Sequence, residues 1–190
     1  MKTMTDKIKM VVFCIVSTRI GWILIAESTE GICLLEFLGK EQPDGTAALD
    51  AIRRAFPKID LAATARMTPL LEKAARAVYD YLKEGAPLPD LPLDLQNGTT
   101  FQQQVWTALR RIPFGETRSY GQIAREIDNP EAARAVGHAC GSNPVPLFVP
   151  CHRVLGSGGA LGGFSAGLHV KKALLSLERA HSQADAESSS

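Results

Sequence analysis

The sequence has few cysteines and aromatic residues, and it lacks any long apolar segment. Its 190 residues include four cysteines and two tryptophans, with no CxxC pair. The longest apolar region, Val11–Ala26, is interrupted by Ser17, Thr18 and Arg19, whereas a membrane span needs roughly 18 apolar residues in succession. The N-terminus carries Asp6 and leads into an apolar segment too short for a signal peptide. These absences exclude a disulfide-stapled secreted domain and a membrane protein, so we expect a cytoplasmic protein of bacterial type.

Metal-binding patterns are missing as well. All histidines lie in the second half of the chain, at His138, His152, His169 and His181. Cys14 and Cys33 lie in the first half, so no group has the spacing of a tetrahedral zinc site. We therefore expect no metal and no cofactor, and we expect these two cysteines to act as small buried residues.

The net charge of +1 is unevenly distributed. Residues 1–96 hold 12 Lys and Arg against 13 Asp and Glu, residues 97–180 hold 9 against 5, and residues 181–190 add two acidic side chains. A mildly basic C-terminal half permits contact with nucleic acid without requiring it. With 45% hydrophobic and 22% charged residues, the composition is typical of one or two small globular domains.

The first half predicts an α/β domain. Three segments rich in Val, Ile and Leu are separated by short polar turns and predict an antiparallel meander over residues 9–17, 21–28 and 31–39. Helices are expected over residues 47–56 and from Thr68-Pro69 to Gly85, the second with Leu70, Ala74, Ala77, Val78, Tyr81 and Leu82 on its apolar face. A proline-rich connection follows, and we place the domain boundary between residues 96 and 97.

The second half predicts a helical domain over residues 97–180. A helix capped by Thr99 or Thr100 is followed by two short helices, within residues 119–127 and 131–140, joined by a turn at Asp128-Asn129-Pro130. This is a helix-turn-helix pattern. A last helix is expected over residues 170–179 with Ala173, Leu174 and Leu177 facing inward, and residues 181–190 are expected to be a disordered tail.

The second short helix, EAARAVGHAC, has few side chains that could read bases. Only Arg134 and His138 offer polar groups, and the remaining residues are mostly Ala, Gly and Val. If this helix contacts DNA, we expect it to position the backbone with little sequence specificity. The alternative is that its alanines only pack against neighbouring helices.

The densest group of chemically capable residues lies at residues 143–167. Cys151 adjoins His152 and Arg153, and a cysteine becomes nucleophilic when a cation or a base stabilises its thiolate. Cys151 and His152 can pair only if the backbone turns there, and Asn143 could bond the backbone of such a bend. The glycine-rich segment that follows lacks the Gly-Lys-Ser/Thr ending of a phosphate-binding loop. A buried, unreactive thiol at Cys151 remains the alternative.

The motifs PCHRV, NPVP and GFSAG, in this order, resemble the active-site segment of the O6-alkylguanine-DNA alkyltransferases, also called methylated-DNA–protein-cysteine methyltransferases. The similarity extends over nearly all of residues 98–180 and is strongest to the alkyltransferase domain of bacterial Ada. It implies an α+β fold with a ribonuclease H-like N-terminal domain and a C-terminal domain of winged helix-turn-helix type. The implied partner is double-stranded DNA containing O6-alkylguanine, with O4-alkylthymine as an open second substrate, and the protein is expected to be a monomer.

The resemblance also implies residue roles. Cys151 would accept the alkyl group irreversibly, His152 would take its proton through a water, Glu178 would orient His152, and Asn143 would hold the turn. Arg134 would fill the gap left by the flipped nucleotide, and Tyr120 would donate a hydrogen bond to the leaving guanine. The implied phosphate contacts are Gln102, Asn129 and Ser157, and the implied pocket residues are Tyr120, Val154, Phe164 and Ser165.

The sequence departs from this pattern at some positions. Phe164 stands where many relatives have Tyr, and Gly121 replaces a polar residue, which puts one phosphate contact in doubt. The sensor domain of Ada is not expected, so transcriptional activation is not predicted. Three other functions fit parts of the sequence. Retention of Cys151 disfavours a lesion-sensing DNA-binding module, and the base-poor helix disfavours a helix-turn-helix regulator. A cysteine hydrolase using Cys151, His152 and Asn143 is the weakest alternative, since nothing in the sequence suggests an acyl-binding groove.

Overall fold

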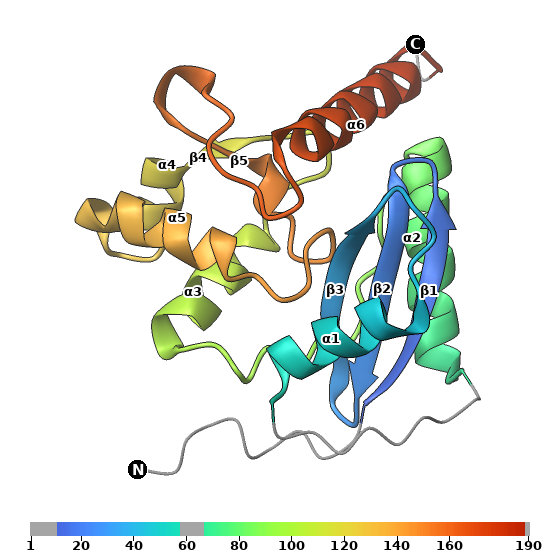
Figure 1. Ribbon diagram of the computed structural model, residues 1–190. Helices are drawn as coiled ribbons and strands as arrows, with labels where there is room; N and C mark the ends of the chain where they lie inside the picture. Colours follow the sequence, from blue (N-terminus) through green and yellow to red (C-terminus); the bar gives the residue numbers. More distant parts are fainter. Residues whose placement is uncertain (1–10, 58–66, 189–190) are drawn as a thin grey trace, which may run out of the picture. The chain divides into compact units, whose positions relative to one another are not determined.

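The computed structural model describes residues 11–57 and 67–188, with side chains described up to residue 184 (Figure 1). The chain divides into two compact units. The first comprises the chain up to Glu84 together with Leu88–Asn97, and the second comprises Gly85–Pro87 together with the chain from Gly98 onward. Each unit has its own packed interior.

The first unit is built on a three-stranded antiparallel sheet in the order β1-β2-β3. Its strands are β1 (Val12–Thr18), β2 (Gly21–Ser28) and β3 (Gly31–Gly39). The predicted meander is confirmed, although Lys9 and Met10 lie outside the described residues. Gly21 is required at its turn, because its φ is +124° and a Cβ there would lie 2.3 Å from the Gly39 carbonyl oxygen.

Two helices cover this sheet, one on each face (Figure 1). Helix α1 (Gly45–Ala55) is capped by the Asp44 side chain, and it packs Ala48, Ala51 and Ile52 into a core with Leu24 and Ala26. Leu24 and Ala26 alternate with Ile23 and Ile25, which point to the opposite face and are also fully buried. The sheet is therefore apolar on both faces.

Helix α2 (Pro69–Glu84) lies against the strands of the sheet. Its buried residues are Leu71, Ala74, Val78, Tyr81 and Leu82. Leu70 and Ala77 of the predicted stripe are half-buried, whereas Leu71, which the prediction does not include, is fully buried with Ala74 and Val78. The connection after α2 runs beside β3, where Ile32 bridges Leu93 and the Ser28 hydroxyl donates to buried Asp94 at 2.7 Å.

The second unit contains the predicted helix-turn-helix. Helix α3 (Thr100–Leu109) is followed by α4 (Tyr120–Glu126), the 3₁₀ turn η2 (Pro130–Ala132) and α5 (Ala133–Gly141). Reciprocal capping boxes begin the first two helices, Thr99 with Gln102 and Ser119 with Gln122. The Trp106 indole of α3 donates to the carbonyl of Ala139 in α5 at 2.8 Å, so the two helices are joined by a buried hydrogen bond.

The rest of this unit consists of short elements and one long helix. Strand β4 (Arg118–Ser119) pairs in parallel with β5 (Val154–Leu155), and the 3₁₀ turns η3 (Cys151–Arg153) and η4 (Ser157–Gly159) flank β5. Helix α6 (Leu168–Ser188) closes the unit.

The expectation of a disordered tail over residues 181–190 is wrong for residues 181–188, which continue helix α6, while residues 189 and 190 lie outside the described residues. No Gly or Pro follows Gly167, and the segment after Arg179 contains several alanines, which favour helix. The His181 ring also packs edge-on against Phe114, with ring centroids 5.8 Å apart, so the helix is held beyond the predicted end.

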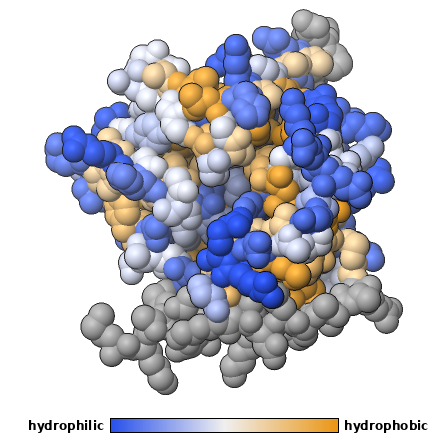
Figure 2. Space-filling model, in the orientation of Figure 1, coloured by the Kyte–Doolittle hydropathy of each residue, from blue (hydrophilic) through white to orange (hydrophobic). Residues whose placement is uncertain are grey.

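The surface is mixed in character. On the face drawn in Figure 2, hydrophobic residues form separate small areas among hydrophilic ones. Among the described residues, no helix combines the length and apolarity that crossing a bilayer requires.

Candidate active site

Cys151 opens a buried turn of three residues. The 3₁₀ turn η3 contains Cys151, His152 and Arg153, and all three side chains are buried, with 5%, 0% and 8% of their surface exposed. The Arg153 amide donates to the Pro150 carbonyl at 3.0 Å, which closes the turn, and the chain then enters β5. The backbone thus bends at the position where the sequence required a bend.

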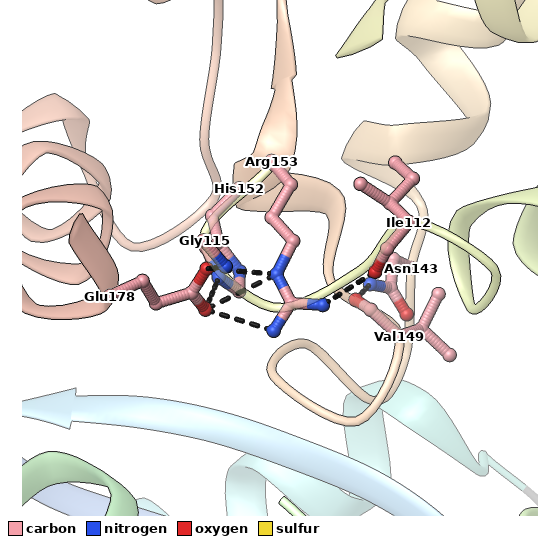
Figure 3. Close-up of polar contacts among 7 residues, drawn as sticks. All are labelled: Ile112, Gly115, Asn143, Val149, His152, Arg153 and Glu178. Carbon is pink, nitrogen blue, oxygen red and sulfur yellow. Dashed lines mark hydrogen bonds and ion pairs between the residues drawn. The ribbon is translucent and has the colours of Figure 1, made fainter. Parts of the chain in front are cut away.

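Asn143 fastens the segment that leads to this turn. Its Oδ1 accepts from the Val145 amide at 3.0 Å, and its Nδ2 donates to the Val149 carbonyl at 2.7 Å (Figure 3). The same Nδ2 lies 3.2 Å from Cys151 Sγ. Leu147, between these contacts, has a φ of +77°, a conformation that a non-glycine residue adopts only when its surroundings hold it. Asn143 therefore bonds the backbone of the bend, as predicted, and also the sulfur.

Glu178 of α6 receives hydrogen bonds from three directions (Figure 3). Its Oε1 lies 2.9 Å from His152 Nε2, and the Gly115 amide donates to its Oε2 at 3.1 Å. The Arg153 guanidinium donates through Nε and Nη2, at distances of 2.9 to 3.2 Å, and its Nη1 donates to the Ile112 carbonyl at 2.7 Å. Arg153 thereby links the η3 turn to Glu178 of α6 and to Ile112, which follows α3.

These contacts set the protonation states of the pair. Burial raises the pKa of Glu178, but the hydrogen bonds from His152 and Arg153 outweigh burial and lower that pKa to about 2. Burial lowers the pKa of His152, although Glu178 acts in the opposite direction. A neutral imidazole beside a carboxylate donates its Nε2–H to Glu178, so its lone pair lies on Nδ1. His152 is therefore arranged to accept a proton at Nδ1.

The surroundings of the Cys151 thiol favour its protonated form. Burial raises its pKa, while the hydrogen bond from Asn143 and the charge of Lys171 act to lower it. Lys171 is itself fully buried, and its Nζ donates to the Val154 carbonyl at 2.7 Å and to the Gly163 carbonyl at 3.4 Å. The sulfur thus needs a base before it becomes a nucleophile.

A pocket of about 490 Å³ opens on the helix-turn-helix unit. It brings together four of the predicted site residues, Tyr120, Arg134, Phe164 and Ser165. The remaining lining residues, which the sequence analysis did not assign to a pocket, are Ala133, Gly137, His138, Gly141, Gly162 and Gly163. A Cβ at Gly162 would lie 2.5 Å from the Tyr120 hydroxyl, so this glycine permits the close approach of the loop to the tyrosine.

The other predicted site residues are dispersed. Val154 is fully buried and does not line this pocket. The Gln102 side chain accepts from the Thr99 amide as part of its capping box. Asn129 and Ser157 are exposed at the starts of η2 and η4. Their predicted phosphate contacts stay predictions.

Two residues of the site were not assigned a role from the sequence. The sequence indicates only that Arg153 adds positive charge near Cys151, yet in the structure it is a main partner of Glu178. The sequence does not indicate the burial of Lys171, because a lysine on a helix is ordinarily solvated. The signal that could have revealed it is its spacing from Glu178, since residues seven apart lie on one helix face. Within the described part of the chain, no cluster of three metal-binding side chains occurs and the four cysteines are free thiols.

A buried thiol next to a histidine–glutamate pair, on a helix-turn-helix scaffold, is the arrangement expected of a protein that combines cysteine chemistry with a DNA-binding type of fold. Comparison with known proteins agrees. Residues 100–180 match the family described as 6-O-methylguanine DNA methyltransferase, DNA binding domain. The chain is 39% identical over 170 residues to the methylated-DNA–protein-cysteine methyltransferase of Methanosarcina acetivorans, covering 87% of this chain and 97% of that one. It is 40% identical over 163 residues to the constitutive enzyme of Bacillus subtilis, covering 85% and 92%. The chain therefore belongs to the family of methylated-DNA–protein-cysteine methyltransferases.

Solved structures give the same fold. The O6-methylguanine methyltransferase of Mycobacterium tuberculosis superposes with a TM-score of 0.70 at 39% identity, covering 90% of this chain and 93% of that one. A structure of the mycobacterial protein in complex with DNA matches with a TM-score of 0.70 at 37% identity, over the same shares. In sequence, the chain is 57% identical over 96 residues to the Mycobacterium bovis relative, which is 50% of this chain and 58% of the relative's length.

Proposed function

We propose that this chain repairs duplex DNA by transferring the alkyl group of O6-alkylguanine to Sγ of its own Cys151. The observation that carries the proposal is the buried cluster in which Asn143 contacts the sulfur and Glu178 holds the adjacent His152 as a neutral base. A relative of this chain is described in complex with DNA, which supports DNA as the partner.

The residues present can carry out the transfer with balanced chemistry. His152 takes the Cys151 proton, directly or through a water, and the charge of Glu178 stabilises the imidazolium that forms. The thiolate attacks the saturated carbon attached to O6, so a carbon–sulfur bond forms as the carbon–oxygen bond breaks. The electron pair of the broken bond stays on O6 of guanine, which takes up one proton in place of the one that His152 removed from Cys151. Guanine is thereby restored and remains part of the DNA strand.

The product explains why the protein would act once. A thioether is stable in water, and no residue of the site offers a route back to the thiol. The expected stoichiometry is one alkyl group per chain, with the protein serving as both reagent and catalyst.

Access to the lesion requires the nucleotide to leave the helix. The alkylated O6 is carried on the edge of a base that is stacked and paired in the duplex, so the base must rotate into a protein pocket before a thiolate in that pocket can reach the alkyl carbon. The pocket lined by Tyr120, Phe164 and Ser165 is the candidate receptor. Arg134 is exposed on α5 at the edge of this pocket, where its planar guanidinium can stack in the vacated space.

The composition of α5 suits repair at any sequence. Its surface offers Arg134 and His138 as the polar side chains near the pocket, and small residues elsewhere let the helix approach DNA closely. Binding then depends chiefly on phosphate contacts, which release counterions and weaken as salt increases. We expect weak sequence preference and strong dependence on ionic strength.

The test is a stoichiometric transfer assay. The full chain is mixed with excess duplex carrying O6-methylguanine under reducing conditions, and peptides are analysed by mass spectrometry. The peptide with Cys151 should gain one methylene, saturating at one per chain. A parallel duplex with O4-methylthymine tests the second substrate.

Matched cysteine variants control this assay. Cys151→Ala should abolish transfer while leaving DNA affinity within about twofold, whereas Cys140→Ala, which removes another buried thiol of the same unit, should still accept the methyl group. Methylation at a different cysteine, or turnover beyond one equivalent, would overturn the proposal.

A further inference from the structure

Lys171 is a buried cation that the proposed mechanism does not use. It lies on α6, two turns before Glu178, and none of its surface is exposed, whereas its neighbour Lys172 is exposed. None of the ion pairs formed within residues 11–57 and 67–188 involves Lys171; its ammonium donates to two backbone carbonyls. Burying an ammonium group without a carboxylate is unfavourable, so its position calls for a reason beyond packing.

The two carbonyls belong to two different segments of the C-terminal unit, β5 and the loop that precedes α6. The stronger bond, at 2.7 Å, goes to Val154, the residue that directly follows the turn of Cys151. The weaker one, at 3.4 Å, goes to Gly163, which lines the pocket and precedes Phe164. Lys171 therefore joins the strand after the nucleophile to the loop that forms the pocket wall.

Electrostatics links the same ammonium to the sulfur. Its charge acts to lower the pKa of Cys151, and Cys151 in turn acts to raise the pKa of Lys171, which burial lowers. The two effects are one interaction seen from both partners, since each charge stabilises the other. A thiolate forming in this buried site would find a positive charge already in place.

We propose that Lys171 is a positioning residue for alkyl transfer: it holds the Gly163 loop to β5 and provides the positive charge that stabilises the Cys151 thiolate as His152 removes its proton. This inference rests on the proposed function for its biological meaning, but its chemical content concerns the reactivity of one thiol. Two other titratable groups interact electrostatically with Cys151, namely Tyr120 of α4 and Cys140 of α5. His152, the next residue of η3, is paired with Glu178 of α6.

The experiment separates charge from hydrogen bonding. Lys171→Met removes both the charge and the hydrogen bonds, Lys171→Gln removes the charge only, and Lys171→Arg keeps both. Exposed Lys172→Met is the matched control. Each chain is treated with neutral iodoacetamide and with anionic iodoacetate, and modification is read at the Cys151 peptide by mass spectrometry. Methyl transfer from O6-methylguanine duplex is measured separately as a single-turnover rate at saturating DNA, together with the Kd for DNA.

The Met and Gln variants should react with iodoacetamide about tenfold more slowly than wild type, since an opposite charge close to a thiol commonly changes its pKa by about one unit or more. Their reaction with iodoacetate should slow further, because the positive potential that attracts an anion is gone. Methyl transfer should slow similarly with the Kd unchanged, and Arg should retain most of the wild-type rate. If the Arg variant does not fold, the reagent ratio in Gln and Met still decides.

Wild-type reactivity in the Gln or Met variant, or equal slowing toward both reagents, would overturn the inference, because loss of packing alone does not distinguish an anion from a neutral reagent. If wild-type Cys151 accepts no methyl group from DNA, the proposed function fails, yet the two iodo reagents still report on Lys171. If transfer occurs and the Lys171 variants match wild type, only this inference fails.

Discussion

Glu178→Gln is expected to lower the free energy of unfolding of the C-terminal unit by about 3 kcal/mol at pH 7. Removing one partner of a buried ion pair typically costs about 3–5 kcal/mol, because the other charge is left uncompensated. The pKa of Glu178, lowered from its ordinary value of 4.5 to about 2, gives a similar figure at about 1.4 kcal/mol per pH unit. The buried partner left without a carboxylate is Arg153, which is 8% exposed.

The pH dependence distinguishes this cause from general damage. A carboxyl with a depressed folded-state pKa contributes stability above its unfolded pKa and loses that stability as the pH falls through the folded value. The difference between wild type and variant should therefore be complete above about pH 5 and should vanish near pH 2. Protonation of His152, whose folded-state pKa is also lowered, should destabilise the protein further as the pH falls below about 6.5.

The assay is urea unfolding followed by tryptophan fluorescence. The chain has two tryptophans, Trp22 in β2 and Trp106 in α3, so a Trp22→Phe background makes the signal specific to the C-terminal unit. The matched control is Glu126→Gln, which removes a surface pair with Arg111 at 3.5 Å and should cost below about 1 kcal/mol. Equal losses for the two variants, or a Glu178→Gln deficit that persists unchanged at pH 2, would refute the reasoning.

Three further predictions concern the bend, the pocket and the flipping residue. Asn143→Ala should destabilise the C-terminal unit by about 2 kcal/mol in the same assay, since it leaves buried backbone groups of Val145 and Val149 without their side-chain partner. The exposed control Asn129→Ala should change the free energy of unfolding by less than about 0.5 kcal/mol. A similar loss in both variants would contradict the role assigned to Asn143. Gly162→Ala should slow methyl transfer at least about tenfold with little change in DNA affinity, because its φ of +63° and the Tyr120 hydroxyl exclude a Cβ; wild-type transfer would show that the loop is free to move. Arg134→Ala should slow repair of duplex about a hundredfold more than reaction with free O6-benzylguanine base, which needs no flipping; equal slowing would remove Arg134 from that step.

Local signals in the sequence predicted the elements that local physics determines. Thr99 and Gln102 form the capping box that their spacing indicates, and the turns at Gly21 and Gly31 separate strands where predicted. Local signals also predict the helix-turn-helix, because α4 and α5 are short and are separated by Asn129-Pro130. Each of these features depends on residues within a few positions of one another.

The interior of the site could not be predicted in this way. On α6, the rule that apolar residues face inward selects Ala173, Leu174 and Leu177. Leu174 is buried, but Ala173 is exposed, whereas Lys171 and Glu178 are buried. Their burial depends on carbonyls, an imidazole and a guanidinium supplied by distant segments, and no periodicity of α6 encodes those partners. Glu178 was assigned only through the family resemblance, which carries information on tertiary contacts that a single sequence lacks.

The raised pKa of Cys151 is consistent with a nucleophile that is used once. In an enzyme that turns over, a permanently ionised thiolate increases the reaction rate. An accidental oxidation or alkylation inactivates one enzyme molecule, and the others continue to catalyse. Here every adventitious reaction at Cys151 would consume the protein entirely, and the thiolate is the reactive form. Burial, which raises the pKa of Cys151, together with a neutral His152 beside it, lowers the thiolate fraction in the resting protein. Such a thiol suits the proposed function, and free Cys151 should resist hydrogen peroxide better than an exposed thiol does.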